Sequence, residues 1–348
     1  MVLPASEGFA PDRAGAIALV VRRLAGAAGA GVIGRRNSAT YPAIDYHPVS
    51  AGSKMFYALG VIRQLRAQRP DVIEIHQQPR LARLIARLFP SARVMLFIHN
   101  DPLEMRGLRR RAERARTLAT LHRVICVSDY LRSRYALGIE PTSSLAVLPN
   151  PLTLMDLPAA TVPRDRLILF AGRIVESKGI ADFIAACAAA LPQLPGWSAA
   201  IIGGDRFGPN SSETRYVAAM RTAAISAGIA FAGYQTHATV LTAMARAAIV
   251  VVPSRWPEPF GLTALEAMAS GAALIATNTG GLPEVIGDAG MMIPPGDSSA
   301  LTGAIIHLAT DGAARIALAA NGRVRAAGFD TAIIAARLEA LRAEKTPL

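Results

Sequence analysis

Short apolar runs alternate with longer amphipathic stretches through the first half of the chain. Three of these runs predict buried strands, at residues 71–76, 93–99 and 123–128. The stretches between them, residues 80–89 and 104–121, have apolar residues at helical spacing and predict helices. Because a parallel strand needs a crossover connection, this order predicts a parallel sheet with right-handed crossovers.

The beginning of the chain fits the same order. Residues 1–4 are interpreted as the end of a first strand whose beginning is missing or very short. A loop that contains Gly8 and Gly15 follows, and the apolar spacing after it predicts a helix from residue 16 to about 24.

A proline-rich segment without periodicity, residues 149–163, predicts a linker. Beyond it, apolar runs predict strands at residues 167–172, 198–205, 229–234, 248–254 and 272–277. A chain of 348 residues is long enough for two domains with separate cores. We therefore expect an α/β protein with domains at residues 1–160 and 161–328. We expect residues 329–348 to include a helix that packs back towards the first domain.

Composition narrows the class of protein. Apolar residues make up 52% of the chain and aromatic residues 5%, which suits a helix-rich α/β protein better than a β-sandwich. Cys126 and Cys187 have apolar neighbours in different halves, so we expect buried, reduced thiols and a cytoplasmic protein. Neither a signal-peptide pattern nor an uninterrupted apolar stretch of transmembrane length is found.

The formal net charge of +12 is concentrated in the first half. Residues 1–160 contain 22 Lys/Arg and 11 Asp/Glu, and part of this excess lies in the predicted helix 104–121. Its arginines are Arg106, Arg109, Arg110, Arg111, Arg114 and Arg116. Such a helix could be a solvated charged face, or it could contact an anionic membrane surface. Nucleic acid is disfavoured, because no nucleic-acid-binding motif is found.

Two carboxylates flank one predicted strand–loop–helix junction. Glu258 lies in the loop after the strand at 248–254, and Glu266 lies about two turns inside the following helix, which Gly271 ends. The helix amino terminus between them would attract an anion. This arrangement suits a ligand in which a diphosphate joins a sugar to a ribose. The diphosphate would lie at the helix amino terminus, and each carboxylate would accept hydrogen bonds from the hydroxyls at one end.

Further candidate residues follow other predicted strands. Arg173 and Lys178 follow the strand at 167–172 and could neutralise a diphosphate, although the segment is not a Walker phosphate loop. His76 and His99 each end a strand of the first half, where ligands of parallel sheets bind. No cluster of His and Cys with metal-ligand spacing is present in the sequence.

The segment from Glu258 to Glu266 resembles the E-x7-E signature of glycosyltransferase family 4, which comprises retaining enzymes of the GT-B architecture. Residues 253–254, 266–271 and 280–286 match the family pattern as well, and 290–297 resembles its closing strand and turn. The resemblance covers residues 167–323. It implies two Rossmann-like domains that face each other across a cleft.

The resemblance also implies roles for the candidate residues. Arg173 and Lys178 would hold the donor diphosphate, together with the helix amino terminus at Phe260, Gly261 and Leu262. Glu266 would bind the ribose, and Glu258 would hold the donor hexose and act in catalysis.

Other parts of the family pattern imply contacts around the donor. His99 would lie near the donor sugar, and Gly15 would let donor and acceptor sugars approach the backbone. Tyr234 would lie near the base. His76 is a second candidate for an acceptor contact.

The implied activity is transfer of a hexosyl or N-acetylhexosaminyl group from a UDP-sugar to an acceptor hydroxyl, with retention and without a metal or cofactor. A cell-envelope glycan or glycolipid, such as lipopolysaccharide core or exopolysaccharide, would be the acceptor, at the cytoplasmic face of the membrane. The alternatives are a UDP-sugar 2-epimerase, a transferase that uses a small soluble sugar or GDP-mannose, and a non-catalytic scaffold. A nicotinamide-dependent oxidoreductase is disfavoured, because no Gly-x-Gly-x-x-Gly follows a predicted strand.

Overall fold

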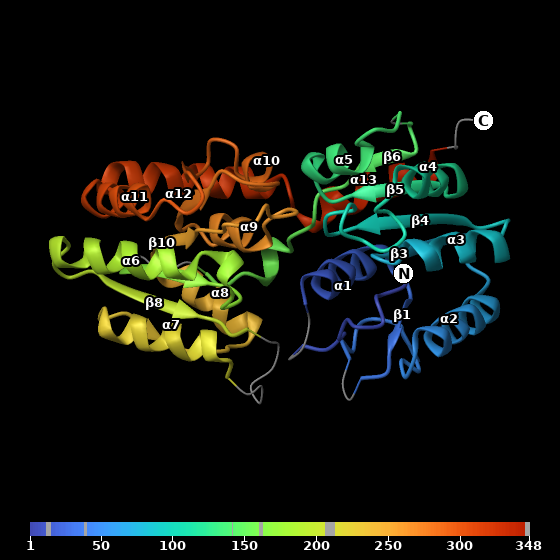
Figure 1. Cartoon of the computed structure of the whole chain (residues 1–348), viewed down its shortest axis with the longest axis horizontal. Helices are drawn as coiled ribbons and strands as arrows, with labels where there is room; N and C mark the ends of the chain where they lie inside the picture. Colours follow the sequence, from blue (N-terminus) through green and yellow to red (C-terminus); the bar gives the residue numbers. More distant parts are fainter. Residues whose placement is uncertain (12–14, 38–39, 141, 160–162, 206–212, 345–348) are drawn as a thin grey trace. The chain divides into compact units, whose positions relative to one another are not determined.

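The computed structural model describes residues 1–11, 15–37, 40–140, 142–159, 163–205 and 213–344. The chain forms two compact units (Figure 1). The first contains Met1–Pro151 and Phe329–Leu348, and the second contains Leu152–Gly328. Both units are built on parallel sheets, which confirms the predicted α/β class. The chain passes from one unit to the other within the proline-rich segment 149–163, of which residues 160–162 lie outside the described residues.

The first unit contains a four-stranded parallel sheet in the order β3-β4-β5-β6 and a parallel pair, β1-β2. Val2 forms bridges with Ile33 of β1 and Ile75 of β3, so it lies between the two sheets. The strands predicted at 71–76, 93–99 and 123–128 are confirmed as β3, β4 and β5. The strand bounds are β1 (Val32–Arg35), β2 (Tyr46–Val49), β3 (Val72–His76), β4 (Arg93–Ile98), β5 (Arg123–Cys126) and β6 (Leu145–Val147).

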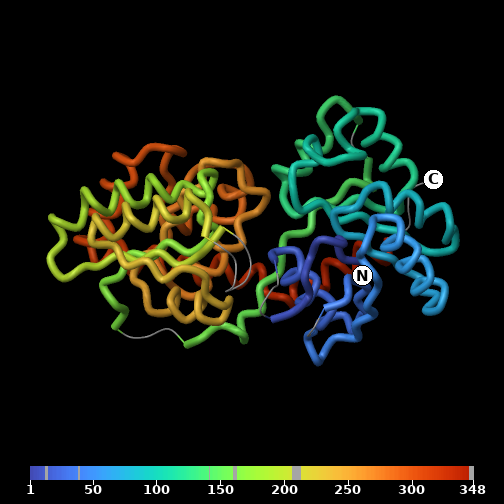
Figure 2. Tube along the Cα trace, turned by 60° about the horizontal axis from the view of Figure 1, so that its bottom comes forward, coloured from blue at the N-terminus to red at the C-terminus, as the bar shows by residue number. Residues whose placement is uncertain are grey.

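The helices of the first unit are α1 (Ala16–Ala28), α2 (Lys54–Gln68), α3 (Pro79–Leu88), α4 (Arg111–Thr120), α5 (Asp129–Ala136) and α13 (Thr331–Ala343). Although α1 and α13 come from opposite ends of the chain, they pack against each other, blue beside red in Figure 2. The Arg342 guanidinium of α13 donates to Glu74 Oε1 of β3 at 2.8 Å, which anchors the end of the chain to the sheet.

The helix predicted over residues 104–121 is present as α4, but its predicted start was wrong, because α4 begins only at Arg111. The preceding residues form a chain of turns. Asp101 Oδ1 accepts a hydrogen bond from the Leu103 N–H at 2.8 Å, and Gly107 has a φ of +96°, which helical residues do not adopt. The local side-chain bond and the left-handed glycine therefore delay the helix.

The second unit contains one six-stranded parallel sheet in the order β12-β11-β10-β7-β8-β9. Its strands are β7 (Asp165–Ala171), β8 (Ser198–Ile202), β9 (Ala230–Phe231), β10 (Ala247–Val252), β11 (Ala273–Thr277) and β12 (Met291–Ile293). All six residues of β10 are buried, as expected of a central strand with helices on both faces. Its neighbours are β7 and β11, so the loops that follow β7 and β10 leave the same edge of the sheet side by side.

Helices cover both faces of this sheet. One face packs against α6 (Ile180–Ala190), α7 (Arg215–Ser226) and α11 (Ser298–Thr310), which share a continuous apolar core with the strands. On the other face, α9 (Leu262–Ala269) contacts α8 (His237–Arg246), α10 (Leu282–Ile286) and α12 (Gly312–Ala327). Short 3-10 turns lie at Leu154–Asp156, Glu176–Lys178 and Leu191–Gln193. Among the described residues, no helix is long and apolar enough to cross a membrane.

Candidate functional site

The loops after β7 and β10 meet at the carboxyl edge of the second unit's sheet. Gly179 ends the short 3-10 turn Glu176–Lys178 with a φ of +69°, and a Cβ atom on it would lie 1.8 Å from the Pro253 carbonyl oxygen. Only a residue without a side chain allows this approach. The contact holds Lys178 beside the loop that carries Glu258.

Lys178 and Glu258 form an ion pair, with 2.5 Å between Lys178 Nζ and Glu258 Oε1. The Ser254 hydroxyl donates to the same oxygen, also at 2.5 Å. The side chain of Lys178 is 29% exposed and that of Glu258 only 10%. The lysine therefore reaches solvent, whereas the carboxylate is fixed at the base of the loop.

Two consecutive glycines support the backbone of Glu258. The Gly281 N–H donates to the Glu258 carbonyl at 2.6 Å, and a Cβ atom on Gly280 would lie 2.3 Å from that same oxygen. Gly280 also has a φ of +61°. The Gly280-Gly281 pair therefore allows the loop after β11 to pack directly on the Glu258 backbone.

Helix α9 begins beside this loop. Gly261 is its N-cap, with a φ of +101°, and the helix starts at Leu262. The first amides of a helix lack intrahelical acceptors and carry partial positive charge, so an anion is favoured here. The Phe260 side chain is buried at 2% exposure. Its side chain therefore packs in the core, and any contribution of Phe260 to donor binding would have to come from its backbone.

Glu266 is the fifth residue of α9, about one turn inside the helix rather than the two turns expected. It is 5% exposed, and its Oε1 lies 2.9 Å from Nε2 of His237, the first residue of α8. Sequence reasoning missed His237, because a histidine at a helix start carries no motif. Thr236 as N-cap fixes where α8 begins and thereby places the imidazole next to Glu266.

Arg173 and Tyr234 lie in neighbouring loops of the same unit. The Arg173 guanidinium donates to the Asp205 carbonyl at 3.3 Å. Its contacts within the described residues include no hydrogen bond to Lys178 or Glu258. Tyr234 is half-buried and follows β9. The Gly203 N–H donates to the Gly233 carbonyl at 2.8 Å, which ties the loops after β8 and β9 together beside it.

The first unit places His76 and His99 in contact. His76 Nδ1 and His99 Nε2 are 2.9 Å apart, and burial lowers the pKa of His99 to about 3 and that of His76 well below its usual value. The His76 side chain is fully buried, so in this structure it does not reach a surface on which an acceptor could bind. It lies behind His99, which is 7% exposed.

Gly15 is the N-cap of α1, with an extended backbone rather than a left-handed one. Glu7 Oε1 accepts a hydrogen bond from the Ala18 N–H at 3.2 Å, and a Cβ atom on Gly15 would lie 2.3 Å from this oxygen. The amino terminus of α1 therefore holds a carboxylate that the sequence did not predict. Burial raises the pKa of Glu7. Residues 12–14 of this loop lie outside the described residues.

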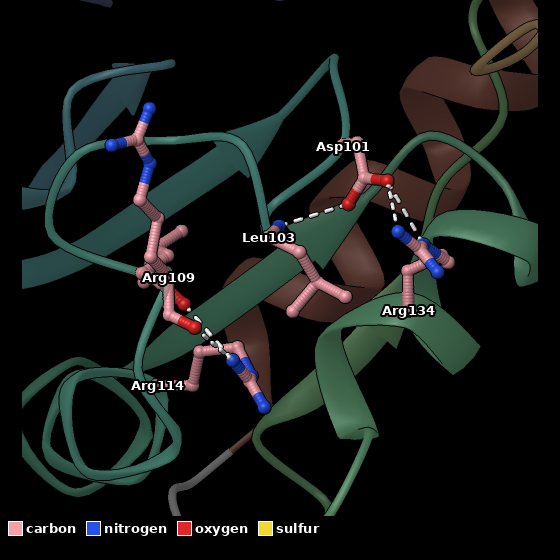
Figure 3. A network of polar contacts seen from close by, with 6 residues as sticks. Asp101, Leu103, Arg109, Arg114 and Arg134 are labelled. Carbon is pink, nitrogen blue, oxygen red and sulfur yellow. Dashed lines mark hydrogen bonds and ion pairs between the residues drawn. The ribbon is translucent and has the colours of Figure 1, made fainter.

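The arginines of residues 104–121 have different roles in the structure. Arg114 is buried and donates to the carbonyls of Leu108, Arg109, Tyr135 and Leu137. Figure 3 shows Arg114 directed to the Arg109 carbonyl, and Asp101 between the Leu103 backbone and the Arg134 guanidinium. Arg114 therefore cannot contact a membrane. Arg80, Arg106, Arg109 and Arg110 remain exposed around one surface hollow.

Two family models match the chain. The model described as "Glycosyltransferase Family 4" matches residues 13–154, and the one described as "Glycosyl transferases group 1" matches residues 159–325. The second match contains Arg173, Lys178, Glu258 and Glu266.

Curated relatives are similar to this chain over only part of their length. Glycogen synthase of Mycobacterium tuberculosis is 34% identical over 193 residues, which are 52% of this chain and 44% of the relative. Lipopolysaccharide core biosynthesis mannosyltransferase LpsB of Rhizobium meliloti is 31% identical over 168 residues, 47% of each chain. The chain thus spans about half the length of these relatives.

Solved structures match over the whole chain. Anabaena Alr3699/HepE in complex with UDP and glucose has a TM-score of 0.81 at 20% identity, and the match covers 99% of both chains. WaaG, a glycosyltransferase involved in lipopolysaccharide biosynthesis, has a TM-score of 0.68 at 16% identity and covers 99% of this chain and 100% of its own. With its two parallel-sheet units and both family models matched, the chain belongs to the glycosyl transferases group 1 family, that is, glycosyltransferase family 4, and has the GT-B fold.

Proposed function

We propose that the chain is a retaining glycosyltransferase, which moves a hexosyl or N-acetylhexosaminyl group from a UDP-sugar to an acceptor hydroxyl. The ion pair between Lys178 and Glu258 carries this proposal. It brings a cation suited to a diphosphate and a carboxylate suited to sugar hydroxyls to one point, beside the amino terminus of α9.

Lys178 would stabilise the departing diphosphate. An ammonium group has three N–H donors, so Lys178 can keep its bond to Glu258 and still donate to phosphate oxygens. Arg173 and the first amides of α9 would add positive charge where negative charge develops in the transition state. This charge is the reason we expect transfer without a metal ion.

Glu266 would bind the ribose. A carboxylate has several lone-pair positions on its two oxygens, so Glu266 can contact the His237 imidazole at 2.9 Å and also accept hydrogen bonds from ribose hydroxyls. Tyr234 is our candidate for contact with the base, since it lies in the loop after β9.

Glu258 would hold the donor hexose rather than attack it. Its Oε1 already accepts hydrogen bonds from Lys178 and Ser254, so the lone pairs of this oxygen are engaged by two donors. An oxygen held by two donors is poorly placed to attack the sugar, so a covalent glycosyl intermediate on Glu258 is disfavoured. Front-face attack, in which the leaving phosphate assists the acceptor proton, fits this environment better.

The comparisons favour UDP as the donor nucleotide and an envelope glycan as the acceptor. A similar structure was solved with UDP and glucose, and two relatives are lipopolysaccharide core mannosyltransferases. GDP-mannose as donor, a small soluble sugar as acceptor and a 2-epimerase reaction are the competing possibilities.

We also propose that the first unit contacts an anionic membrane at the cytoplasmic face. Arg80, Arg106, Arg109 and Arg110 line one hollow with Glu113 and supply net positive charge there. Clustered arginines attract anionic headgroups, and salt weakens the attraction. We expect cosedimentation with phosphatidylglycerol vesicles but not with phosphatidylcholine vesicles, and loss of binding at high salt. Salt-independent binding to both would refute membrane contact through these arginines.

The activity is tested in two steps. Thermal melting with UDP, GDP, ADP and CDP identifies the nucleotide, because a ligand of the folded state raises the melting temperature. Incubation with the matching nucleotide sugars and a crude bacterial lipid extract then separates the reactions. New glycolipid supports the transferase, an epimerised free nucleotide sugar supports the epimerase, and no product with any donor contradicts both.

A further inference from the structure

The contact between His76 and His99 fixes how their protons are arranged. One ring nitrogen must donate and the other accept across the 2.9 Å between His76 Nδ1 and His99 Nε2. Both rings are neutral near pH 7, because burial lowers the pKa of each. Two arrangements remain, in which the shared proton belongs either to His76 Nδ1 or to His99 Nε2.

The other nitrogen of His76 distinguishes the two arrangements. His76 Nε2 is buried and has no hydrogen-bond partner among the described residues. If His99 donated, this nitrogen would carry a proton and become a buried N–H without an acceptor. If His76 donates, it is an unprotonated acceptor. In proteins, buried N–H groups without an acceptor are rarer than buried acceptors without a donor. The arrangement in which His76 donates is therefore favoured.

The His76 ring is held in place by packing. It stacks on Phe97 with ring centroids 4.5 Å apart, and β3 and β4 pair these two residues in register. The next residue, Gln77, has a φ of +59°, and its Oε1 accepts from the His99 N–H at 2.8 Å. The end of β3 therefore fixes both the backbone and the ring of His99.

We propose that His76 is a positioning residue that holds His99 in the Nδ1–H tautomer. His99 then presents an N–H donor, rather than a bare nitrogen, to a hydroxyl of the bound sugar. The sugar as the recipient rests on the proposed function, whereas the tautomer rests only on the geometry of the pair. His76 acts through His99 and does not touch substrate.

Nitrogen-15 spectra of the full chain with labelled histidine test the tautomer without any ligand. The chain has six histidines, and the peaks of the pair are assigned by their loss in His76→Asn and His99→Gln. We expect His76 and His99 both to be protonated at Nδ1 and to stay neutral between pH 5 and 8. A wild-type His99 protonated at Nε2 overturns the proposal.

Two substitutions at position 76 separate positioning from packing. In His76→Asn the side-chain amide can donate from near the place of Nδ1, whereas His76→Phe keeps a ring against Phe97 but removes the donor. We expect His99 to keep the Nδ1–H tautomer in His76→Asn and to lose it in His76→Phe. An unchanged His99 spectrum in His76→Phe also overturns the proposal. If that variant does not fold, the wild-type and His76→Asn spectra decide.

Release of UDP from UDP-glucose provides a second readout. We expect His76→Phe to lower kcat about tenfold, or ~1.4 kcal/mol, with little change in KM, and His76→Asn to restore most of it. Equal losses in both variants would indicate a merely structural role and contradict positioning. If the wild-type chain releases no UDP, the proposed function fails on this donor, while the spectra still decide the tautomer.

Discussion

Gly179 lies against Pro253 so closely that a Cβ atom on the glycine would come within 1.8 Å of the proline's carbonyl oxygen. This contact joins the loop after β7 to the loop after β10. It is the reason why Lys178 and Glu258, which are 80 positions apart in the sequence, form an ion pair.

Gly179→Ala should therefore destabilise the second unit and weaken nucleotide binding. Gly228→Ala is a matched control, because Gly228 has nearly the same φ, +70° against +69°, but open space around it. We expect the control to cost about 1 kcal/mol from its left-handed backbone alone, and Gly179→Ala to cost about 3 kcal/mol or more from the added clash. Denaturant unfolding measures both, and equal losses would show that the contact with Pro253 is unimportant.

Arg114 supports the fold rather than a surface interaction. Its replacement by alanine leaves four backbone carbonyls without their donor, and we expect a loss of about 3 kcal/mol in the free energy of unfolding. The exposed Arg116, on the same helix, should tolerate alanine within about 0.5 kcal/mol. Binding to anionic vesicles should fall instead when Arg106 and Arg109 are replaced. Equal stability of the two single variants would contradict the role of Arg114.

Glu7 gives a pH-dependent prediction. Burial raises the folded-state pKa of Glu7 above its ordinary value of 4.5, so the ionised carboxylate costs stability above that pH and the cost disappears below it. Glu7→Gln should raise the melting temperature at pH 8 and have little effect at pH 4.5. The exposed Glu140→Gln is the control for removing one surface carboxylate. A stabilisation by Glu7→Gln that is larger at pH 4.5 than at pH 8 would reverse the sign and refute the assignment.

The two glutamates of the second unit should affect different kinetic quantities. Glu266→Ala removes the carboxylate assigned to the ribose and should weaken UDP binding, by about tenfold for one lost hydrogen bond to a charged group. Glu258→Ala should mainly lower turnover, with smaller effects on UDP binding. Thermal shifts with UDP and initial rates of sugar transfer measure the two effects. The division of roles fails if Glu258→Ala abolishes UDP binding while Glu266→Ala leaves it intact.

Most of the longer strands could be predicted from the sequence, because buried parallel strands are continuous apolar runs. β7, β10 and β11 were predicted within a few residues, and the helix expected within residues 329–348 is α13. The short strands β1, β2 and β6 were missed, since so short a run has no recognisable period. The delayed start of α4 was also missed, because it depends on one side-chain bond of Asp101 and one left-handed glycine.

The candidate site was predicted in its residues but not in their contacts. The sequence pointed to Lys178 and Glu258 separately, and their ion pair depends on the adjacency of β7 and β10, which are distant in the chain. His237 beside Glu266 and Glu7 at the start of α1 were missed because neither residue lies in a recognisable motif. The burial of His76 could not be deduced either, because a histidine at a strand end fits a ligand contact as well as a core position.

The most direct measurement is a calorimetric titration of UDP into the wild-type chain, Lys178→Ala and Lys54→Ala. Lys54, at the start of α2 in the first unit, is an exposed lysine that tests for the loss of charge alone. We predict that UDP binds the wild type and Lys54→Ala equally, and Lys178→Ala at least about tenfold more weakly, as expected when a charge-assisted bond to phosphate is lost. Equal UDP affinity of Lys178→Ala and the wild type would contradict the proposal that the Lys178–Glu258 pair marks the diphosphate site.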